Sequence, residues 1–195
     1  AAAPAPAPPR PASVDLRAEE AEVERLLGAG QAAAAERRAR ELGARHPQHP
    51  LGWRALGSAL LAQQRDQEAL PALERAAQLA PADVSTLVAL GEALQRLGLA
   101  SEAELAYRKA LGVAPGSLAA LLGMAALRLR TYRYADAESL CRQALAVDAG
   151  NADAWLVLGD AQLGLRQVDA AVSSFQRALA LRPGWIAAYQ KLGTL

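Results

Sequence analysis

The histidines and the cysteine of this 195-residue sequence are the first candidates for metal binding or nucleophilic chemistry, and there are three of them. His46 and His49 flank Pro47 and have the short spacing of a metal-binding pair. A zinc site needs three or four ligands, and no further histidine or cysteine lies near this pair in the sequence. We therefore expect the two histidines in a connecting loop. The third residue, Cys141, is the only cysteine, which excludes an intramolecular disulfide.

The segment from Arg128 to Tyr134, RLRTYRY, is the one local cluster of basic and aromatic residues. Such a cluster could anchor an acidic partner or stack on a nucleobase. The alternative is a solvated turn between two helices, with its tyrosines packed on the adjacent part of the fold. Nucleic-acid binding needs a longer basic stripe, and the formal net charge of the chain is only +1. We favour the turn and predict no nucleic-acid partner.

No other pattern indicates chemistry. Neither a glycine-rich phosphate loop nor a Ser/His/Asp arrangement of recognisable spacing is present. The sequence therefore predicts no enzyme within these residues, no cofactor and no metal. Charged or polar residues interrupt every apolar stretch before it reaches the roughly 20 residues that span a bilayer, so no direct membrane insertion is expected.

The composition favours helices throughout. Ala, Leu, Arg, Glu and Gln dominate, which are the residues that lose least on entering a helix, whereas aromatic residues make up only 4%. Apolar residues make up 52% of the chain, which is enough to bury a substantial core. We expect an all-α protein.

The strongest pattern is a period of 34 residues. Pro47, Pro81 and Pro115 are 34 residues apart, and Pro183 lies two further periods on. Small and bulky residues repeat with the same interval in four further series: Trp53, Leu87, Leu121 and Trp155; Ala69, Ala103, Ala137 and Ala171; Leu73, Tyr107, Cys141 and Phe175; and Ala76, Ala110, Ala144 and Ala178.

This pattern resembles the tetratricopeptide repeat, a 34-residue helix-turn-helix unit with W-x2-L-G, then Ala, an aromatic residue, Ala and Pro. The resemblance covers about nine-tenths of the chain and rests on several positions that keep one register. It implies a right-handed α-solenoid of antiparallel helix pairs. Cys141 occupies the bulky apolar position of a second helix, so we expect a buried hydrophobic residue rather than a reactive thiol.

The period divides the chain into units. Four full repeats are expected at 50–83, 84–117, 118–151 and 152–185, preceded by a degenerate capping repeat at 15–49. Residues 1–14 are rich in Ala and Pro, which predicts a disordered linker. Residues 186–195 form the first helix of a further repeat or a capping helix. This helix carries an uncovered apolar stripe of Ile186, Tyr189, Leu192 and Leu195.

Particular positions within the units carry local expectations. Trp53 and Trp155 are expected to fill the gap between the two helices of their own unit, and Tyr107 and Phe175 to reach toward neighbours. Ser101 and Glu104 have the spacing of a capping box. Asp83 and Asp169 are expected to cap other helices.

In this family, ligands usually lie in the concave groove lined by the first helices of successive units. The resemblance therefore implies a partner-binding groove formed by first-helix residues that are not core. These are Arg54, Ser58, Leu61, Val88, Glu92, Arg96, Leu122, Ala126, Leu129, Arg130, Leu156, Asp160 and Leu163. Leu, Val and Ala between scattered charges suit an amphipathic helix or an apolar extended segment.

Two specialised binding modes of the family are absent. The carboxylate clamp for chaperone tails needs Lys and Asn at positions that hold Arg54, Ser58, Ala89, Ala119 and Gly123 here. The asparagine ladder of O-linked N-acetylglucosamine transferases would need Asn at Ala55, Ala89, Gly123 and Val157.

The leading functional hypothesis is a scaffold that binds a peptide or partner protein in its concave groove, in a bacterial envelope, secretion or pilus assembly. The alternative is the recruiting or regulatory region of a larger enzyme, such as a glycosyltransferase or a sulfotransferase. A third hypothesis is self-association through the stripe on the C-terminal helix. The sequence does not distinguish the bacterial cytoplasm from the periplasm.

Overall fold

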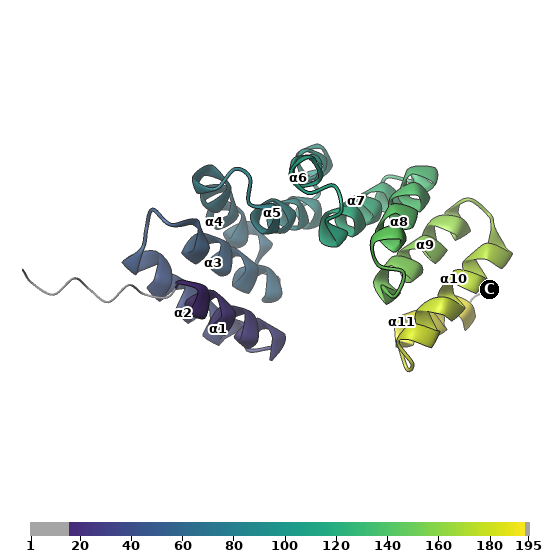
Figure 1. The fold of residues 1–195 in the computed structure, drawn as a ribbon, viewed down its shortest axis with the longest axis horizontal. Helices are drawn as coiled ribbons and strands as arrows, with labels where there is room; N and C mark the ends of the chain where they lie inside the picture. Colours follow the sequence, from purple (N-terminus) through teal and green to yellow (C-terminus); the bar gives the residue numbers. More distant parts are fainter. Residues whose placement is uncertain (1–15, 194–195) are drawn as a thin grey trace, which may run out of the picture.

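The computed structural model describes residues 16–193, and this part of the chain forms eleven α-helices and no strands (Figure 1). The linker expected at 1–14 and the side chain of Leu195 lie outside the described residues. The helices are α1 (Leu16–Gly28), α2 (Ala32–Arg45), α3 (Pro50–Ala62), α4 (Asp66–Leu79), α5 (Val84–Arg96), α6 (Ala100–Val113), α7 (Leu118–Arg130), α8 (Tyr134–Val147), α9 (Ala152–Gly164), α10 (Val168–Leu181) and α11 (Ile186–Gly193).

The turn inside each helix pair has one repeated geometry. Residues 30, 64, 98, 132 and 166 all have positive φ, from 58° at Tyr132 to 81° at Gly98. The next amide in each turn donates to a carbonyl five residues back, as Arg133 does to Arg128 at 2.8 Å. This bond and the left-handed residue end the first helix in a Schellman motif. The motif recurs with the 34-residue period although glycine occupies the position only at Gly30 and Gly98.

The connectors between units end in side-chain caps. His49, Asp83, Ser117 and Asn151 each accept a hydrogen bond from a backbone N–H in the first turn of α3, α5, α7 and α9. The expected cap at Asp83 is therefore confirmed. The second helices from α2 to α10 follow the tight Schellman turn directly, and none of them has a side-chain cap.

Two expected caps are wrong for that reason. Helix α6 begins at Ala100, so Ser101 lies inside the first turn, and Glu104 forms an ion pair with Arg128 instead of closing a capping box. Asp169 likewise lies inside the first turn of α10. In both helices the turn geometry, rather than a polar side chain, sets the start.

The pairs stack into a curved array. Each helix packs on the next, and the first helices of successive units, α1, α3, α5, α7 and α9, also contact one another directly. Comparable packing between successive second helices is not found in the described residues. The array therefore curves with the first helices on its inner face, and Figure 1 shows α4 and α6 on the outer side of the arch.

The core position of each second helix is matched in size to the first helix that it faces. A Cβ added to Gly91 or Gly123 would lie 2.7 Å or 2.5 Å from the Tyr107 ring, so this ring needs a glycine on both α5 and α7. One unit later the corresponding residues are Cys141 with Ala125 and Val157, which pack in one cluster. The small thiol is thus compensated by larger partners, which keeps the packing dense.

Candidate protein-interaction surfaces

The first helices align their inner-face residues in three rows, because equivalent positions are 34 residues apart. The first row contains Arg54, Val88, Leu122 and Leu156, and the second contains Ser58, Glu92, Ala126 and Asp160. The third contains Leu61, Gln95, Leu129 and Leu163. All these residues are partly exposed except Leu61, which is 5% exposed and packs with Leu73 and Ala93. Leu61 therefore offers little surface to a partner.

The charged residues of the inner face are engaged within the array. Arg54 contacts Glu20 of α1 and lies 3.6 Å from Asp83, and Lys191 of α11 lies 2.6 Å from Asp160. Glu92 pairs with Arg96 at 2.5 Å in α5. Because these pairs are partly exposed, each contributes little to stability. Their main effect here is to neutralise the charges of Arg54, Glu92, Arg96 and Asp160 along the face.

Arg96 and Arg130 also connect successive first helices. Arg96 donates to the carbonyl of Leu61 at 3.0 Å, and Arg130 donates to the carbonyl of Gln95 at 2.9 Å. Each arginine thereby adds a second donor to a carbonyl at the C-terminal end of the preceding first helix, which also accepts a backbone N–H of the turn. Although both residues are exposed, the structure gives them a bracing role within the inner face.

An apolar row remains between these charges. Val88, Leu122 and Leu156 are equivalent positions on α5, α7 and α9, which pack side by side, and each is partly exposed. We call this set the apolar row. No polar group of these side chains needs a partner, so an apolar side chain from another molecule could cover them at a gain of about 25 cal/mol per Å².

The two tryptophans differ from expectation. Trp53 and Trp155 are only partly buried, so neither is a fully buried core residue. Each indole N–H donates to a carbonyl six residues back in the connector, at 2.9 Å for Trp53 with Pro47 and 3.0 Å for Trp155 with Ala149. These bonds hold the rings against the preceding second helix. Cys141, Tyr107 and Phe175 take the central core position instead.

Related cavities lie on the outer side of the array, where successive second helices are separated. One lies between α4 and α6, a second between α6 and α8, and a third between α8 and α10, and in each the intervening first helix forms the floor. A fourth lies beside Trp53 and α2. The sequence pattern did not indicate them, because they depend on the spacing of helices that are distant in the chain.

The basic and aromatic segment 128–134 is divided by the fold. Tyr132 forms the left-handed turn residue and is 78% exposed, whereas the ring of Tyr134 packs over Gly164 of α9. Arg128 is 7% exposed and makes a bidentate pair with Glu104, both N–O distances being 2.7 Å. These hydrogen bonds lower the pKa of Glu104 to about 2. The segment is therefore a turn whose Arg128 and Arg133 pair with carboxylates of α6 and α8.

Both histidines cap helices at the connector between α2 and α3. His49 Nδ1 accepts from the amide of Leu51 at 3.3 Å and caps α3, while His46 caps the end of α2. Within residues 16–193, no group of three or more His, Cys, Asp or Glu residues has the arrangement of a metal site. Nor does any helix of this range combine the length and apolar character that a bilayer span requires.

Cys141 is completely buried, and burial raises the pKa of its thiol to about 12 from an ordinary value of 9.0. At a pH near 8 this reduces the thiolate fraction about a thousandfold. We therefore expect a disulfide reagent such as DTNB to react with the folded protein far more slowly than with the chain in denaturant. Reaction of the folded protein at the rate of a free cysteine would contradict this placement.

The stripe on α11 is largely open. Ile186 is 70% exposed and Tyr189 is 55% exposed, whereas Ala188 is buried against the array. The helix packs on α10 and leaves its other side uncovered among the described residues. The stripe is consistent with a further helix, a partner or a second copy, and it does not favour one of them.

Stacked helical hairpins, partly apolar faces and the local geometry above define this chain as a helical-repeat protein of the protein-interaction class. Tetratricopeptide-repeat family models match residues 21–84, 84–117 and 129–194. The chain belongs to the tetratricopeptide-repeat family. A search of curated proteins gave no significant match.

Solved structures share the fold. TTC0263, a thermophilic TPR protein in Thermus thermophilus, has a TM-score of 0.80 and 18% identity over 92% of this chain and 97% of its own. MamA from Desulfovibrio magneticus RS-1 has a TM-score of 0.64 and 27% identity, with 73% and 80% of the two chains covered. YrrB, described as a TPR protein with an unusual peptide-binding site, has a TM-score of 0.66 and 15% identity, covering 92% of each chain.

Proposed function

We propose that this chain is a protein-interaction scaffold that binds a peptide or partner protein along its inner face, as part of a bacterial envelope, secretion or pilus assembly. The observation that carries this proposal is the apolar row of Val88, Leu122 and Leu156. Its members are partly exposed on three neighbouring helices, while the surrounding charges are paired within the array.

The geometry favours a particular kind of ligand. An amphipathic helix or an apolar extended segment could place side chains at successive positions of the row. Leu129 and Leu163, in the adjacent row of partly exposed residues, widen the apolar surface beside α7 and α9. A highly acidic or basic tail suits this face less well, because Arg54, Glu92 and Asp160 already have partners. YrrB, with its peptide-binding site, offers a precedent for the fold.

The test compares partner capture by two double variants of the whole chain. L122E/L156E introduces charge into the apolar row, whereas L105E/V147E makes the same chemical change at positions that are 55% and 54% exposed on second helices. Quantitative mass spectrometry of proteins retained from a lysate should show partners lost from the first variant and kept by the second. Circular dichroism should show both variants folded.

If both folded double variants retain the same partners, the inner-face proposal is wrong. Because Leu122 also touches the core, L122A/L156A provides a milder second change. It should weaken capture of the same partners without adding charge. Unchanged capture by this variant would also contradict a role for the row.

A further inference from the structure

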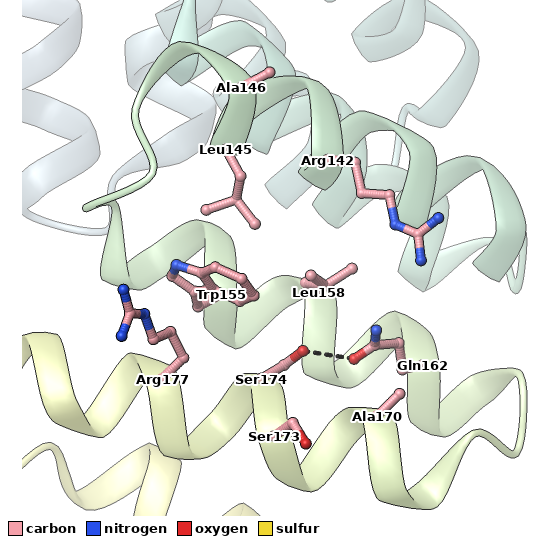
Figure 2. A pocket seen from close by; sticks show the side chains of 10 residues that line it. All are labelled: Arg142, Leu145, Ala146, Trp155, Leu158, Gln162, Ala170, Ser173, Ser174 and Arg177. Atoms are coloured by element: carbon pink, nitrogen blue, oxygen red, sulfur yellow. Dashed lines mark hydrogen bonds between the residues drawn. The ribbon is translucent and has the colours of Figure 1, made fainter.

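The cavity between α8 and α10 differs from its relatives on the outer face. Its volume is about 620 Å³, compared with about 230 Å³ between α4 and α6 and about 320 Å³ between α6 and α8. Side-chain size on the second wall contributes to the difference from the α4–α6 cavity, whereas the α6–α8 cavity also has a serine there, Ser139. Ser173 of α10 stands where Leu105 stands on α6, so the wall recedes and the floor is open (Figure 2).

The floor of this cavity is apolar and fixed in orientation. Trp155 presents part of its ring, and the bond from its indole N–H to Ala149 holds that ring in place. Leu158, which is 4% exposed, lies beside it, and Leu145 of α8 closes the upper side in Figure 2. A bound apolar side chain would stack on an ordered indole rather than on a flexible surface, which reduces the entropy cost of binding.

One polar group in the wall lacks a partner. Gln162 is only 6% exposed, and its amide oxygen accepts from Ser174 Oγ at 2.6 Å. Its amide nitrogen donates to no group in the described part of the chain, and Figure 2 shows the amide at one end of the cavity. The amide nitrogen keeps some exposure, so it can donate to a ligand that brings a carbonyl or carboxylate oxygen.

The charges around the cavity are positive. Arg142 of α8 and Arg177 of α10 line it, and no acidic side chain does. Arg142 pairs with Glu138 at 2.8 Å, whereas Arg177 has no ion-pair or hydrogen-bond partner within residues 16–193. The related cavity between α4 and α6 has the opposite character, because Glu74 and Glu102 line it. The charge therefore favours an anionic partner at the α8–α10 cavity over the α4–α6 cavity.

We propose that the cavity between α8 and α10 binds an acidic peptide segment that inserts one bulky apolar side chain over Trp155. Carboxylates beside that side chain meet Arg142 and Arg177, and an oxygen of the peptide accepts from the Gln162 amide. This is a second interaction surface on the outer face, separate from the inner-face apolar row. The two surfaces together would let one array hold two different segments.

The probe is a labelled, end-blocked helical peptide of about 15 residues, which spans about four helical turns. It carries one Leu-Phe pair flanked by glutamates, and a matched peptide carries glutamines instead. In ¹H–¹⁵N spectra the whole chain gives three indole signals, from its three tryptophans. Titration with the acidic peptide should shift the Trp155 indole signal and leave that of Trp53 in place, and the glutamine peptide should bind at least about tenfold more weakly.

Two matched variants assign the site. S173L supplies the leucine that already occupies the equivalent position of α6, and it should weaken binding at least about tenfold by filling the cavity. S139L makes the same change in the cavity between α6 and α8 and should leave binding unchanged. R177Q, which introduces the residue found at the equivalent Gln143, should weaken binding and reduce its salt dependence.

The outcomes separate this inference from the inner-face proposal. Retained binding by the L122E/L156E variant supports the outer-face site, and loss of binding by that folded variant overturns it. The inference is also wrong if the Trp155 signal does not move, if S173L binds as well as the unmodified chain, or if the glutamine peptide binds equally well. None of these results affects partner capture by the apolar row.

Discussion

Replacing Phe175 by alanine is expected to lower the free energy of unfolding by about 3–5 kcal/mol. Phe175 is fully buried at the central core position of α10, and its ring lies so close to Gly159 that an added Cβ would stand 2.4 Å away. A ring packed against backbone leaves a cavity that the surrounding helices can fill only by moving. Urea unfolding followed by far-UV circular dichroism measures the loss.

Two control variants test whether the loss of stability comes from removing a buried ring. F175L introduces the residue that fills the same position in the first full repeat, where Leu73 faces Gly57, so it should cost less than half as much. Y189A removes a larger side chain that is 55% exposed on α11 and should change stability by less than about 0.5 kcal/mol. A loss below about 1 kcal/mol for F175A would show that the ring does not hold the last repeat together.

The repeat architecture was predictable from the sequence because it depends on spacing. Alanines such as Ala69 and Ala103 keep their interval since two helices can approach closely only at small residues, and both are fully buried in the structure. Bulky core residues follow the same rule, so Tyr107, Cys141 and Phe175 were placed in the core. The residue type at this core position varies from repeat to repeat while the 34-residue spacing is kept, because the first-helix residues that face it change size in the opposite direction.

The errors concern interactions that spacing does not encode. Trp53 and Trp155 recur where the family pattern has a core aromatic residue, yet their indole N–H groups bond to connector carbonyls and the rings are only partly buried. Ser101 and Glu104 have capping-box spacing, but the Schellman turn before α6 leaves no capping position for Ser101. Burial of Arg128 could not be predicted from the sequence either, since its partner, Glu104, lies 24 residues away on another helix.

The surfaces were predictable to different degrees. The inner face followed from the register, and the structure confirms that Val88, Leu122 and Leu156 are aligned on adjacent, packed helices; their binding role stays a prediction. The outer cavities depend on the distance between second helices and on side-chain size at positions such as Ser173. Only coordinates give that distance, although the exchange of leucine for serine at this position was visible in the repeat alignment.

The Glu104–Arg128 pair provides the second large effect. Replacing Glu104 by leucine leaves Arg128 buried with only Asp136 nearby, at 3.8 Å, and should cost about 3–5 kcal/mol. Arg128→Leu should cost less, because Glu104 is 22% exposed and keeps Arg108 at 2.5 Å.

The double variant E104L/R128L reproduces Leu70 and Leu94, which pack together one repeat earlier. It should therefore recover most of the stability, as measured by a double-mutant cycle in urea.

The same pair predicts a dependence on pH with a definite sign. The pKa of Glu104 is lowered from 4.5 to about 2 in the folded protein, so its stabilising contribution is complete above pH 4.5 and is lost as the pH falls toward 2. At a pH near 3 the unmodified chain should lose about 2 kcal/mol that E104L/R128L does not lose. The other carboxylates are common to both proteins, and Asp136, which lies 3.8 Å from Arg128, is the more distant partner, so the difference reports mainly on the Glu104–Arg128 pair. Parallel loss of stability in the two proteins between pH 4.5 and 2 would show that the bidentate contact contributes no linkage to folding.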